Sequence, residues 1–259
     1  MTSERDRTDA ALPGRSRGRS LKVRSERIPM THLTDPTTKT IAFLLYEGGT
    51  PLDLIGPLQV LGALGPRYRA VVVSDVTRPV AMDVPIRLQA TAVLEDVPRP
   101  DVLVIPGGTA GTYRAMHDDR ILQYVRDAAE HATTVMSVCT GSLILGAAGL
   151  LQGRDATTHW AAAKLLERYG ARYVRRRWIE DDRFLMTAGV SAGIDGALHL
   201  AAKLTERTHA QTVQAWLEYD PQPPFGPFDW QLADVDRLPP DWFEQQAQQA
   251  LRAQGPAKD

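Results

Sequence analysis

The sequence predicts an α/β protein with a doubly wound, mainly parallel sheet flanked by helices. Three observations favour this fold: short apolar runs have the composition of strands buried on both faces, segments with helical spacing separate these runs, and turn residues follow them. Strands that alternate with helices form right-handed βαβ units, which place the strands side by side in a parallel sheet.

The predicted strands are apolar segments with few interruptions. Those expected in the parallel sheet are Thr40–Tyr46, Tyr68–Ser74, Asp101–Gly108 and Thr133–Val138. The first is followed by Glu-Gly-Gly-Thr, and the third ends in a glycine turn. Further along, RRRWIEDDRFLMTAG predicts a β-hairpin with its turn near Asp181–Asp182.

The first predicted helix follows the first strand. Pro51 suits its first turn, whereas Pro57 must bend or delay it. Its apolar side chains have helical spacing, at Leu52, Ile55, Leu58 and Leu61. The other predicted helices are Ile121–Ala132, a small-residue segment directly after Cys139, Ile194–Thr205, Thr208–Glu218 and a terminal helix in PPDWFEQQAQQALRAQ.

The composition argues against several classes of partner. The 259 residues are 43% hydrophobic and can form a sizeable core, and a net charge of -1 gives no reason to expect nucleic acid. No apolar run reaches the length of about 18 residues that a membrane span needs. One cysteine cannot form an internal disulfide, and the N-terminus lacks the apolar core of a signal peptide. We therefore expect a cytoplasmic protein without nucleic-acid or membrane partners.

Cys139 is the main candidate for a functional residue. In open α/β sheets ligands bind beyond the carboxyl ends of the strands, where Asp53, Gly107–Gly108 and Cys139 are expected. The segment SVCTGS has the pattern of a nucleophile elbow, with the small residues Ser137 and Gly141 two positions on either side of the cysteine. A buried structural cysteine is the alternative, because free cysteines are among the most buried residues.

The expected position also predicts the chemistry. A cysteine at a helix N-terminus lies near unpaired backbone N–H groups, which favour the thiolate. The N–H of Thr140, with one from the turn at Gly108 and Thr109, could form an oxyanion hole.

Four segments resemble one known family. VLVIPGG, SVCTGSLILGAAGLL, ATTHW and AGVSAGIDGALHLAA are similar to the ThiJ/PfpI superfamily, whose fold is of the class I glutamine amidotransferase (flavodoxin-like) type. Within it, the resemblance is greatest to isonitrile hydratases and to the amidase-like domain of certain AraC-type regulators. The similarity covers about residues 40–225.

The resemblance implies roles for three residues. Asp53 takes the place of an acid that reaches the cysteine, and since two adjacent negative charges repel, one of the pair should hold a proton. An acid that only complements the helix dipole is the alternative. Thr140 stands where protease-like members have histidine, which disfavours proteolysis, and its hydroxyl could orient water or contact substrate. His159 matches a histidine near the cysteine in deglycase-like members, and a packed structural histidine is an equal alternative.

Other candidate sites are weaker. Asp195 could face the pocket, but an acid at a helix start more often serves as a cap. Gly107–Gly108 lacks the spacing of a dinucleotide fingerprint, and the histidines show no metal-ligand spacing. We therefore expect neither a cofactor nor a metal.

The chain divides into three parts. Residues 1–38 are rich in Arg, Ser, Gly and Asp, which predicts a disordered tail, solvated rather than bound to nucleic acid or membrane; Met30 is a possible alternative start. Residues 39–225 are the expected ThiJ/PfpI-like catalytic domain, and residues 226–259 a C-terminal extension with a helix.

The resemblance implies an enzyme that hydrates an isonitrile to an N-substituted formamide through a thioimidate on Cys139. Two alternatives remain: a glyoxalase or deglycase acting on 2-oxoaldehydes, and a non-catalytic ligand sensor related to AraC-type regulators. About 40 residues after Tyr219, not basic in composition, are too few for the DNA-binding domain of those regulators. The expected partners are a small-molecule substrate and, because homodimers are common in the superfamily, a second copy of the chain.

Overall fold

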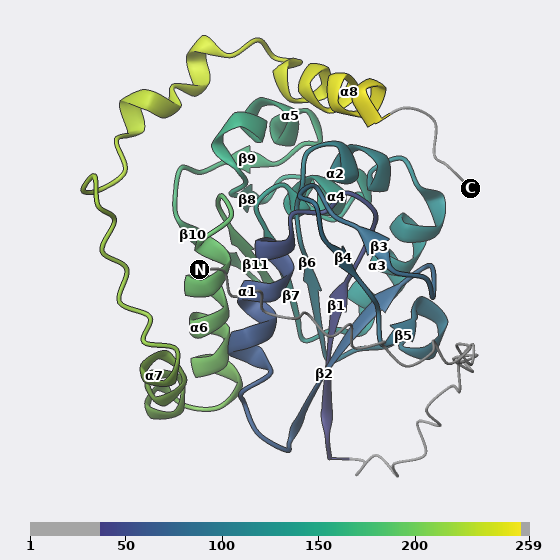
Figure 1. Ribbon diagram of the computed structural model, residues 1–259, viewed down its shortest axis with the longest axis vertical. Helices are drawn as coiled ribbons and strands as arrows, with labels where there is room; N and C mark the ends of the chain where they lie inside the picture. Colours follow the sequence, from purple (N-terminus) through teal and green to yellow (C-terminus); the bar gives the residue numbers. More distant parts are fainter. Residues whose placement is uncertain (1–36, 255–259) are drawn as a thin grey trace, which may run out of the picture. The chain divides into compact units, whose positions relative to one another are not determined.

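A seven-stranded sheet forms the centre of the protein, whose computed structural model describes residues 37–254 (Figure 1). The expected disordered tail and the alternative start at Met30 therefore lie outside the described residues, apart from Thr37 and Thr38. Across the sheet the strands are β10 (Trp178–Asp181), β11 (Phe184–Thr187), β7 (Thr134–Val138), β6 (Val102–Ile105), β1 (Lys39–Leu44), β2 (Tyr68–Ser74) and β5 (Ala92–Val93).

All neighbouring strands of this sheet run parallel except β10 and β11, which form the predicted antiparallel hairpin. Asp182 lies in its turn with φ 58°, a left-handed conformation that aspartate tolerates better than most residues. Two small sheets pair β3 (Val80–Ala81) with β4 (Arg87–Leu88) and β8 (Asp155–Ala156) with β9 (Arg172–Tyr173). The doubly wound, mainly parallel fold predicted from the sequence is confirmed.

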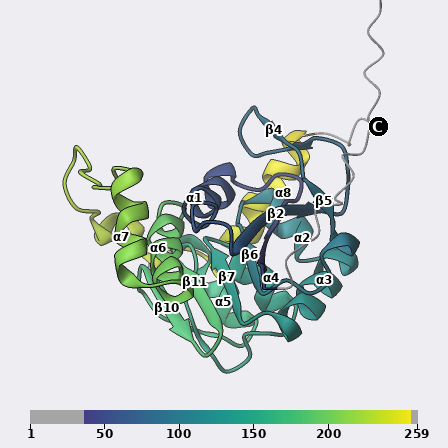
Figure 2. The ribbon, with the colours of Figure 1, turned by 90° about the horizontal axis from the view of Figure 1, so that it is seen from below.

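Helices lie on both faces of the sheet, as Figure 2 shows for α1 and α6 on one side and α3 and α4 on the other. The α-helices are α1 (Pro51–Leu61), α2 (Ala110–Ala115), α3 (Asp119–His131), α4 (Gly141–Ala147), α5 (Ala163–Arg168), α6 (Ala192–Leu204), α7 (Arg207–Trp216) and α8 (Trp242–Gln254). The 3-10 turns are η1 (Leu94–Asp96), η2 (Trp160–Ala162), η3 (Trp230–Ala233) and η4 (Val235–Arg237). Within residues 37–254 no helix is long and apolar enough to cross a membrane.

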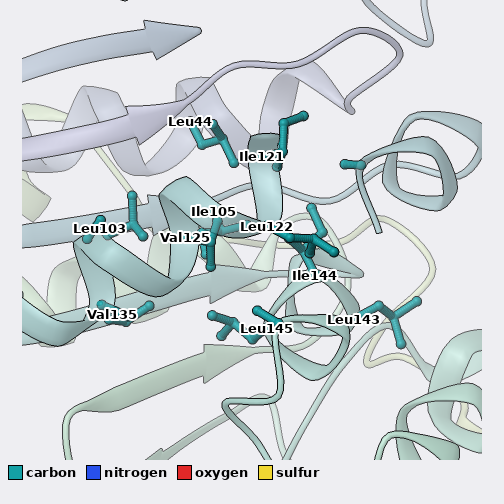
Figure 3. Close-up of a cluster of buried hydrophobic side chains, with 14 of the residues drawn as sticks. Leu44, Leu103, Ile105, Ile121, Leu122, Val125, Val135, Leu143, Ile144 and Leu145 are labelled. Carbon is teal, nitrogen blue, oxygen red and sulfur yellow. The ribbon is translucent and has the colours of Figure 1, made fainter. Parts of the chain in front are cut away.

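Alternate side chains of each strand build two separate cores. In β1, Ala42 and Leu44 face the core under α3 and α4, whereas Ile41 and Phe43 face the core under α6. Figure 3 shows the first core, where side chains of β6 and β7 meet those of α3 and α4. Since successive strand residues point to opposite faces, a run without polar interruption is what a strand covered on both sides requires.

Helix α1 forms where it was predicted, but its buried face differs from its apolar stripe. Leu52 and Ile55 are 45% and 39% exposed, while Gly56 is buried against α6. A Cβ at Gly56 would lie 3.1 Å from Ile194, so the small residue decides which face meets α6. Pro57 does not delay the helix, which begins at Pro51, although it removes the N–H that would bond to the carbonyl of Asp53.

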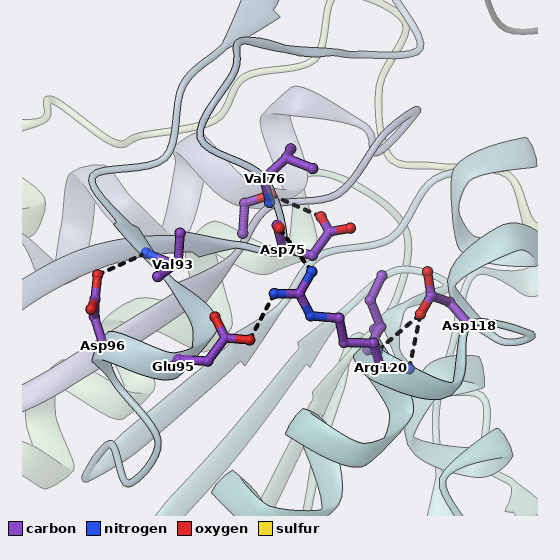
Figure 4. Close-up of polar contacts among 9 residues, drawn as sticks. Asp75, Val76, Val93, Glu95, Asp96, Asp118 and Arg120 are labelled. Carbon is purple, nitrogen blue, oxygen red and sulfur yellow. Dashed lines mark hydrogen bonds and ion pairs between the residues drawn. The ribbon is translucent and has the colours of Figure 1, made fainter. Parts of the chain in front are cut away.

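Helix α3 is anchored by two side chains near its start (Figure 4). The Asp118 carboxylate accepts hydrogen bonds from the N–H groups of Arg120 and Ile121, at 3.0 and 3.1 Å, which satisfies two donors of the first turn. The Arg120 guanidinium donates to the Asp75 carbonyl at 3.0 Å and to Glu95 at 2.7 Å. These contacts fasten α3 to the ends of β2 and β5.

The C-terminal segment returns to the sheet and ends in α8, which packs on α2 and η2. Lys164 donates to the carbonyl of Leu238 at 2.5 Å, and Arg168 forms an ion pair with Glu244. Phe243 of α8 belongs to the same core as α3 and α4. The predicted terminal helix is therefore packed against the domain that carries the sheet.

The burial of Phe184 generates a stability prediction. This β11 side chain is 1% exposed, and the guanidinium carbons of Arg154 and Arg183 lie 4.8 and 5.5 Å from its ring centroid. Phe184→Ala should lower the free energy of unfolding, measured in urea, by about 3–5 kcal/mol. Phe225, which is 98% exposed, supplies the control, because Phe225→Ala should change that energy by less than about 0.5 kcal/mol. Equal effects of the two substitutions would contradict the packing.

Candidate active site

A cavity of about 480 Å³ opens at the carboxyl edge of the sheet. The loops after β1, β6, β7 and β11 border it, as the topology of an open α/β sheet predicts. Five of the six residues singled out in the sequence line it, namely Cys139, Thr140, Gly108, Thr109 and His159. The sixth, Asp53, is fully buried behind Cys139.

Cys139 lies between β7 and α4 with φ 55°. A non-glycine residue in this left-handed region is strained and persists only where its surroundings impose it. Here the Cys139 N–H donates to the carbonyls of Thr187 and Ala188, at 3.1 and 3.0 Å, and the Cys139 carbonyl accepts from Thr158 Oγ1 at 3.1 Å. The hydrogen bonds of the peptide groups before and after Cys139 hold the turn in this conformation.

The turn also needs glycine at two positions. A Cβ on Gly141 would lie 2.3 Å from the Ile105 carbonyl oxygen, so only glycine lets α4 begin this close to β6. A Cβ on Gly107 would lie 2.6 Å from both the backbone nitrogen and Oγ1 of Thr140. The end of β6 and the start of α4 therefore touch through backbone atoms.

Asp53 has no exposed surface, and its two carboxyl oxygens differ. Oδ2 accepts the Gly107 N–H at 3.0 Å, whereas Oδ1 is buried without a hydrogen-bonding partner among the described residues. Burial raises the pKa of Asp53 to about 7, against the lowering effects of the Gly107 N–H and the Cys139 thiol. A carboxyl with this pKa can accept and release a proton near neutral pH.

The Cys139 thiol corrects one expectation from the sequence. Burial and the adjacent Asp53 charge raise its pKa, while the backbone N–H groups of Val190 and Thr140 act in the opposite direction. The expectation that a helix N-terminus would favour the thiolate is wrong on balance, because the sulfur is buried beside an acid. Burial beside Asp53 therefore favours the thiol over the thiolate.

The Thr140 hydroxyl is engaged with the protein rather than with the cavity. It donates to the Gly108 carbonyl at 2.6 Å and accepts the Gly108 N–H at 2.9 Å. Thr112 Oγ1 lies 3.0 Å from both Thr140 Oγ1 and the Tyr46 hydroxyl, which itself donates to the Pro106 carbonyl at 2.7 Å. Since Thr140 and Tyr46 already donate their hydroxyl protons to these carbonyls, Thr112 donates its own proton to one of the two oxygens at a time, and Thr140 stays bound to Gly108.

This arrangement changes the expected oxyanion hole. The Gly108 N–H is already bound to Thr140 Oγ1. Of the N–H groups expected to form the oxyanion hole, those of Thr109 and Thr140 therefore remain. Val190, which follows β11 and lines the cavity, directs its N–H at the Cys139 sulfur and was not identified from the sequence. In the sequence, the small residues of AGVSAG, which follow β11, could have indicated a role for Val190.

His159 lines the cavity with its ring partly buried. Its Nδ1 accepts the Ala161 N–H at 3.3 Å, so the neutral ring carries its proton on Nε2. Burial lowers the pKa of His159, which favours this neutral form. A Cβ on Gly189 would lie 2.8 Å from His159 Cδ2, so Gly189 leaves the space that the ring occupies.

The rest of the lining is neutral or acidic. Among the described residues that border the cavity there is no lysine or arginine, and the charged side chain there is Asp83, which accepts from Thr50 Oγ1 at 2.5 Å. Asp195 is not among the lining residues and does not cap α6: it pairs with Arg177 at 2.5 Å. Four residues of α8 complete the lining, and no sequence signal linked them to Cys139.

Fold and site together define a class of protein: an α/β domain with a cysteine in a left-handed turn after a central strand, next to a buried acid. The model of the DJ-1/PfpI family matches residues 39–207, and the chain belongs to this family. The resemblance identified from the sequence is thus confirmed.

Known proteins similar to the chain agree with this assignment. An isonitrile hydratase from Pseudomonas putida is 46% identical over 71% of this chain and 80% of its own length. The solved structure of a THiJ/PfpI family protein from Pseudomonas syringae is 33% identical, with a TM-score of 0.73, and the match covers 90% of this chain and 95% of that one. DJ-1beta of Drosophila melanogaster, 19% identical with a TM-score of 0.65 over 71% of this chain and 100% of its own, shares the fold.

The buried Asp53 carboxyl predicts an unusual dependence of stability on pH. Its pKa is about 7 in the folded chain and about 3.9 when unfolded, so the folded state binds more protons between these values, loses stability as pH rises from about 4 to 7, and loses little more above 7. Above pH 7 the ionised carboxylate costs roughly 4 kcal/mol. Asp53→Asn should therefore unfold at higher urea concentration than the native chain at pH 8, with a smaller difference at pH 5.

Glu130→Gln is the control, because the Glu130 side chain is exposed and its substitution should shift the urea midpoint little at either pH. An Asp53→Asn variant less stable than the native chain at pH 8 would contradict the inferred cost of the buried carboxylate.

Proposed function

We propose that the chain is an isonitrile hydratase that adds water to R–N≡C and releases the N-substituted formamide R–NH–CHO. The observation that supports this proposal most is the buried Asp53 carboxyl beside the Cys139 thiol. The thiol is a nucleophile, and the carboxyl can carry its proton. The reaction needs these two groups and water, and it needs no external oxidant or reductant. The 46% identity to the Pseudomonas putida isonitrile hydratase supports the same activity.

In the first step, Cys139 Sγ forms a bond to the terminal carbon of the isonitrile. Asp53, ionised, takes the thiol proton as the sulfur attacks, and then delivers it to that carbon. The carbon–nitrogen triple bond becomes a double bond, and the product is a thioimidate, R–N=CH–S–Cys139. Because the thiol pKa is raised, a base next to the sulfur is what makes it nucleophilic.

In the second step, water adds to the thioimidate carbon. One water proton goes to the nitrogen and the hydroxyl stays on carbon, which gives a tetrahedral R–NH–CH(OH)–S–Cys139. Its collapse breaks the carbon–sulfur bond and forms the formamide carbonyl, while the hydroxyl proton returns through Asp53 to the sulfur. Splitting the hydration into two steps is the general advantage of covalent catalysis.

The surrounding groups have positioning and binding roles in this proposal. Thr140 holds the Gly107–Gly108 peptides against Asp53 through its bonds to Gly108, so it is a positioning residue. We propose that the N–H groups of Thr109, Thr140 and Val190, residues that line the cavity, bind the developing oxyanion, and that the neutral His159 ring donates its Nε2–H to substrate or water.

We also propose that the chain acts as a homodimer, as its family resemblance implied. Leu52 and Ile55 on α1 are exposed apolar side chains that a second copy would cover. The division into a domain at residues 39–225 and an extension at 226–259 likewise stays a prediction.

Removal of the sulfur tests the nucleophile. Cys139→Ala should lower kcat/KM for a small isonitrile by at least about 10³-fold, because residual binding cannot replace the covalent step. Intact mass of the native chain, quenched during turnover, should show one isonitrile added, and since Cys139 is the only cysteine, the variant should show none.

Methylglyoxal is assayed beside the isonitrile. Full activity of Cys139→Ala with the isonitrile would contradict the mechanism. Turnover of methylglyoxal without formamide production would favour the glyoxalase or deglycase alternative, and tight binding without turnover of either would favour a ligand sensor.

The pH profile tests Asp53. Because ionised Asp53 must accept the thiol proton and its pKa is about 7, kcat/KM should fall below pH 7, by about tenfold per unit, and level off above it. Asp53→Asn should lose both this slope and most of the activity, while Glu130→Gln keeps the native profile. A native profile that is flat from pH 5 to 8 would rule out Asp53 as the base.

A further inference from the structure

The inner face of α8 forms one wall of the cavity that contains Cys139. Trp242, Gln246 and Ala250 line it at successive turns of the helix, and Phe243 lines it beside Trp242. Spacing of four residues places side chains on the same face of a helix, so one stripe of α8 faces the cavity. Three of these four side chains are apolar.

This wall is a fixed part of the structure. Phe243 and Ala247 are buried, and Phe243 belongs to the core of α3 and α4. On the outer side, Glu244 is paired with Arg168, and Gln248 donates to the Tyr113 hydroxyl at 3.4 Å. The α8 side chains therefore face the cavity in a defined arrangement.

The isonitrile group itself limits how a substrate can lie. The R–N–C unit is linear, so when its terminal carbon is at Cys139 Sγ the substituent R is held away from the sulfur and lies in the remaining cavity. A volume of about 480 Å³ is within the range that binds drug-sized ligands. A one- or two-carbon substituent would leave most of it to water.

The chemistry of the lining indicates which substituent fits. Among the described lining residues no cation is present to bind a carboxylate or phosphate, and Asp83 would repel one. Trp242 and Phe243 offer flat apolar surfaces, against which an aromatic ring packs with favourable geometry. The lining thus favours a neutral, aromatic or similarly large apolar group.

We infer that α8 is the specificity wall of the enzyme and selects isonitriles with an aromatic or comparably large apolar N-substituent. This inference rests on the proposed isonitrile hydratase activity and adds the substrate class. The family match at residues 39–207 does not reach α8, so it carries no information on this wall.

Two substitutions of opposite steric effect test the wall, with benzyl and ethyl isonitrile as substrates. The native chain should show at least about a tenfold higher kcat/KM for the benzyl compound. Trp242→Ala removes ring contacts and should lower kcat/KM about tenfold for benzyl isonitrile and less than about twofold for ethyl isonitrile. Ala250→Leu fills cavity space, keeps Trp242, and should also reduce turnover of the benzyl compound selectively.

Two controls separate specificity from general damage. Trp216→Ala removes a tryptophan on α7 that is 85% exposed, and Gln249→Ala removes an exposed glutamine of α8 that is not among the cavity-lining residues. Both should leave the ratio of the two kcat/KM values unchanged. If Trp242→Ala lowers both activities together with the melting temperature, Ala250→Leu decides the question.

The outcomes distinguish the two proposals. Equal kcat/KM values of the native chain for both isonitriles, or equal losses for both in Ala250→Leu, would overturn the specificity wall and leave isonitrile hydration standing. Formation of formamide from neither compound would overturn the proposed function itself.

Discussion

The close approach of the start of α4 to the end of β6 is the constraint on which the site depends. Gly141 meets the carbonyl of Ile105, and Gly107 meets the backbone of Thr140, at separations that admit no Cβ at either glycine. Because α4 must begin so near the sheet, the chain turns sharply at Cys139, and this residue takes a left-handed conformation. The same approach brings the Gly107 N–H to Asp53 and the Gly108 peptide to Thr140.

A second consequence of this packing is electrostatic. Asp53 lies on the buried face of α1, which packs on α6 through Gly56, so the carboxyl has no exposed surface. An acid there opposes folding at neutral pH, and it stays because two cores, one on each face of the sheet, supply far more stability than it costs. Desolvation is also what brings its pKa to about 7, where proton transfer to and from a neighbouring sulfur is efficient.

Much of the fold could be predicted because strands buried on both faces leave a strong signal. Tyr68–Ser74 was predicted as a strand and is β2 without change, and the hairpin turns at Asp182 as expected. The buried face of α1 could not be predicted, since Gly56 determines it through contact with Ile194, a residue distant in sequence. Propensity and apolar spacing describe a helix, but contacts between helices decide which side is buried.

The same division applies to the site. Asp53, Gly108 and Cys139 could be placed together because each follows a strand of one parallel sheet, whose carboxyl ends share an edge. The raised pKa of the thiol could not be foreseen, because it depends on how deeply the sulfur is buried rather than on its place at a helix start. Trp242 lies more than 100 residues from Cys139, on a helix that no strand positions, so only the folded chain brings it to the cavity. It follows that chemistry and shape have separate structural origins here. The strained turn and the acid beside it depend on the close packing at the carboxyl edge of the sheet, where Gly107 and Gly141 admit no Cβ, whereas the wall opposite comes from α8.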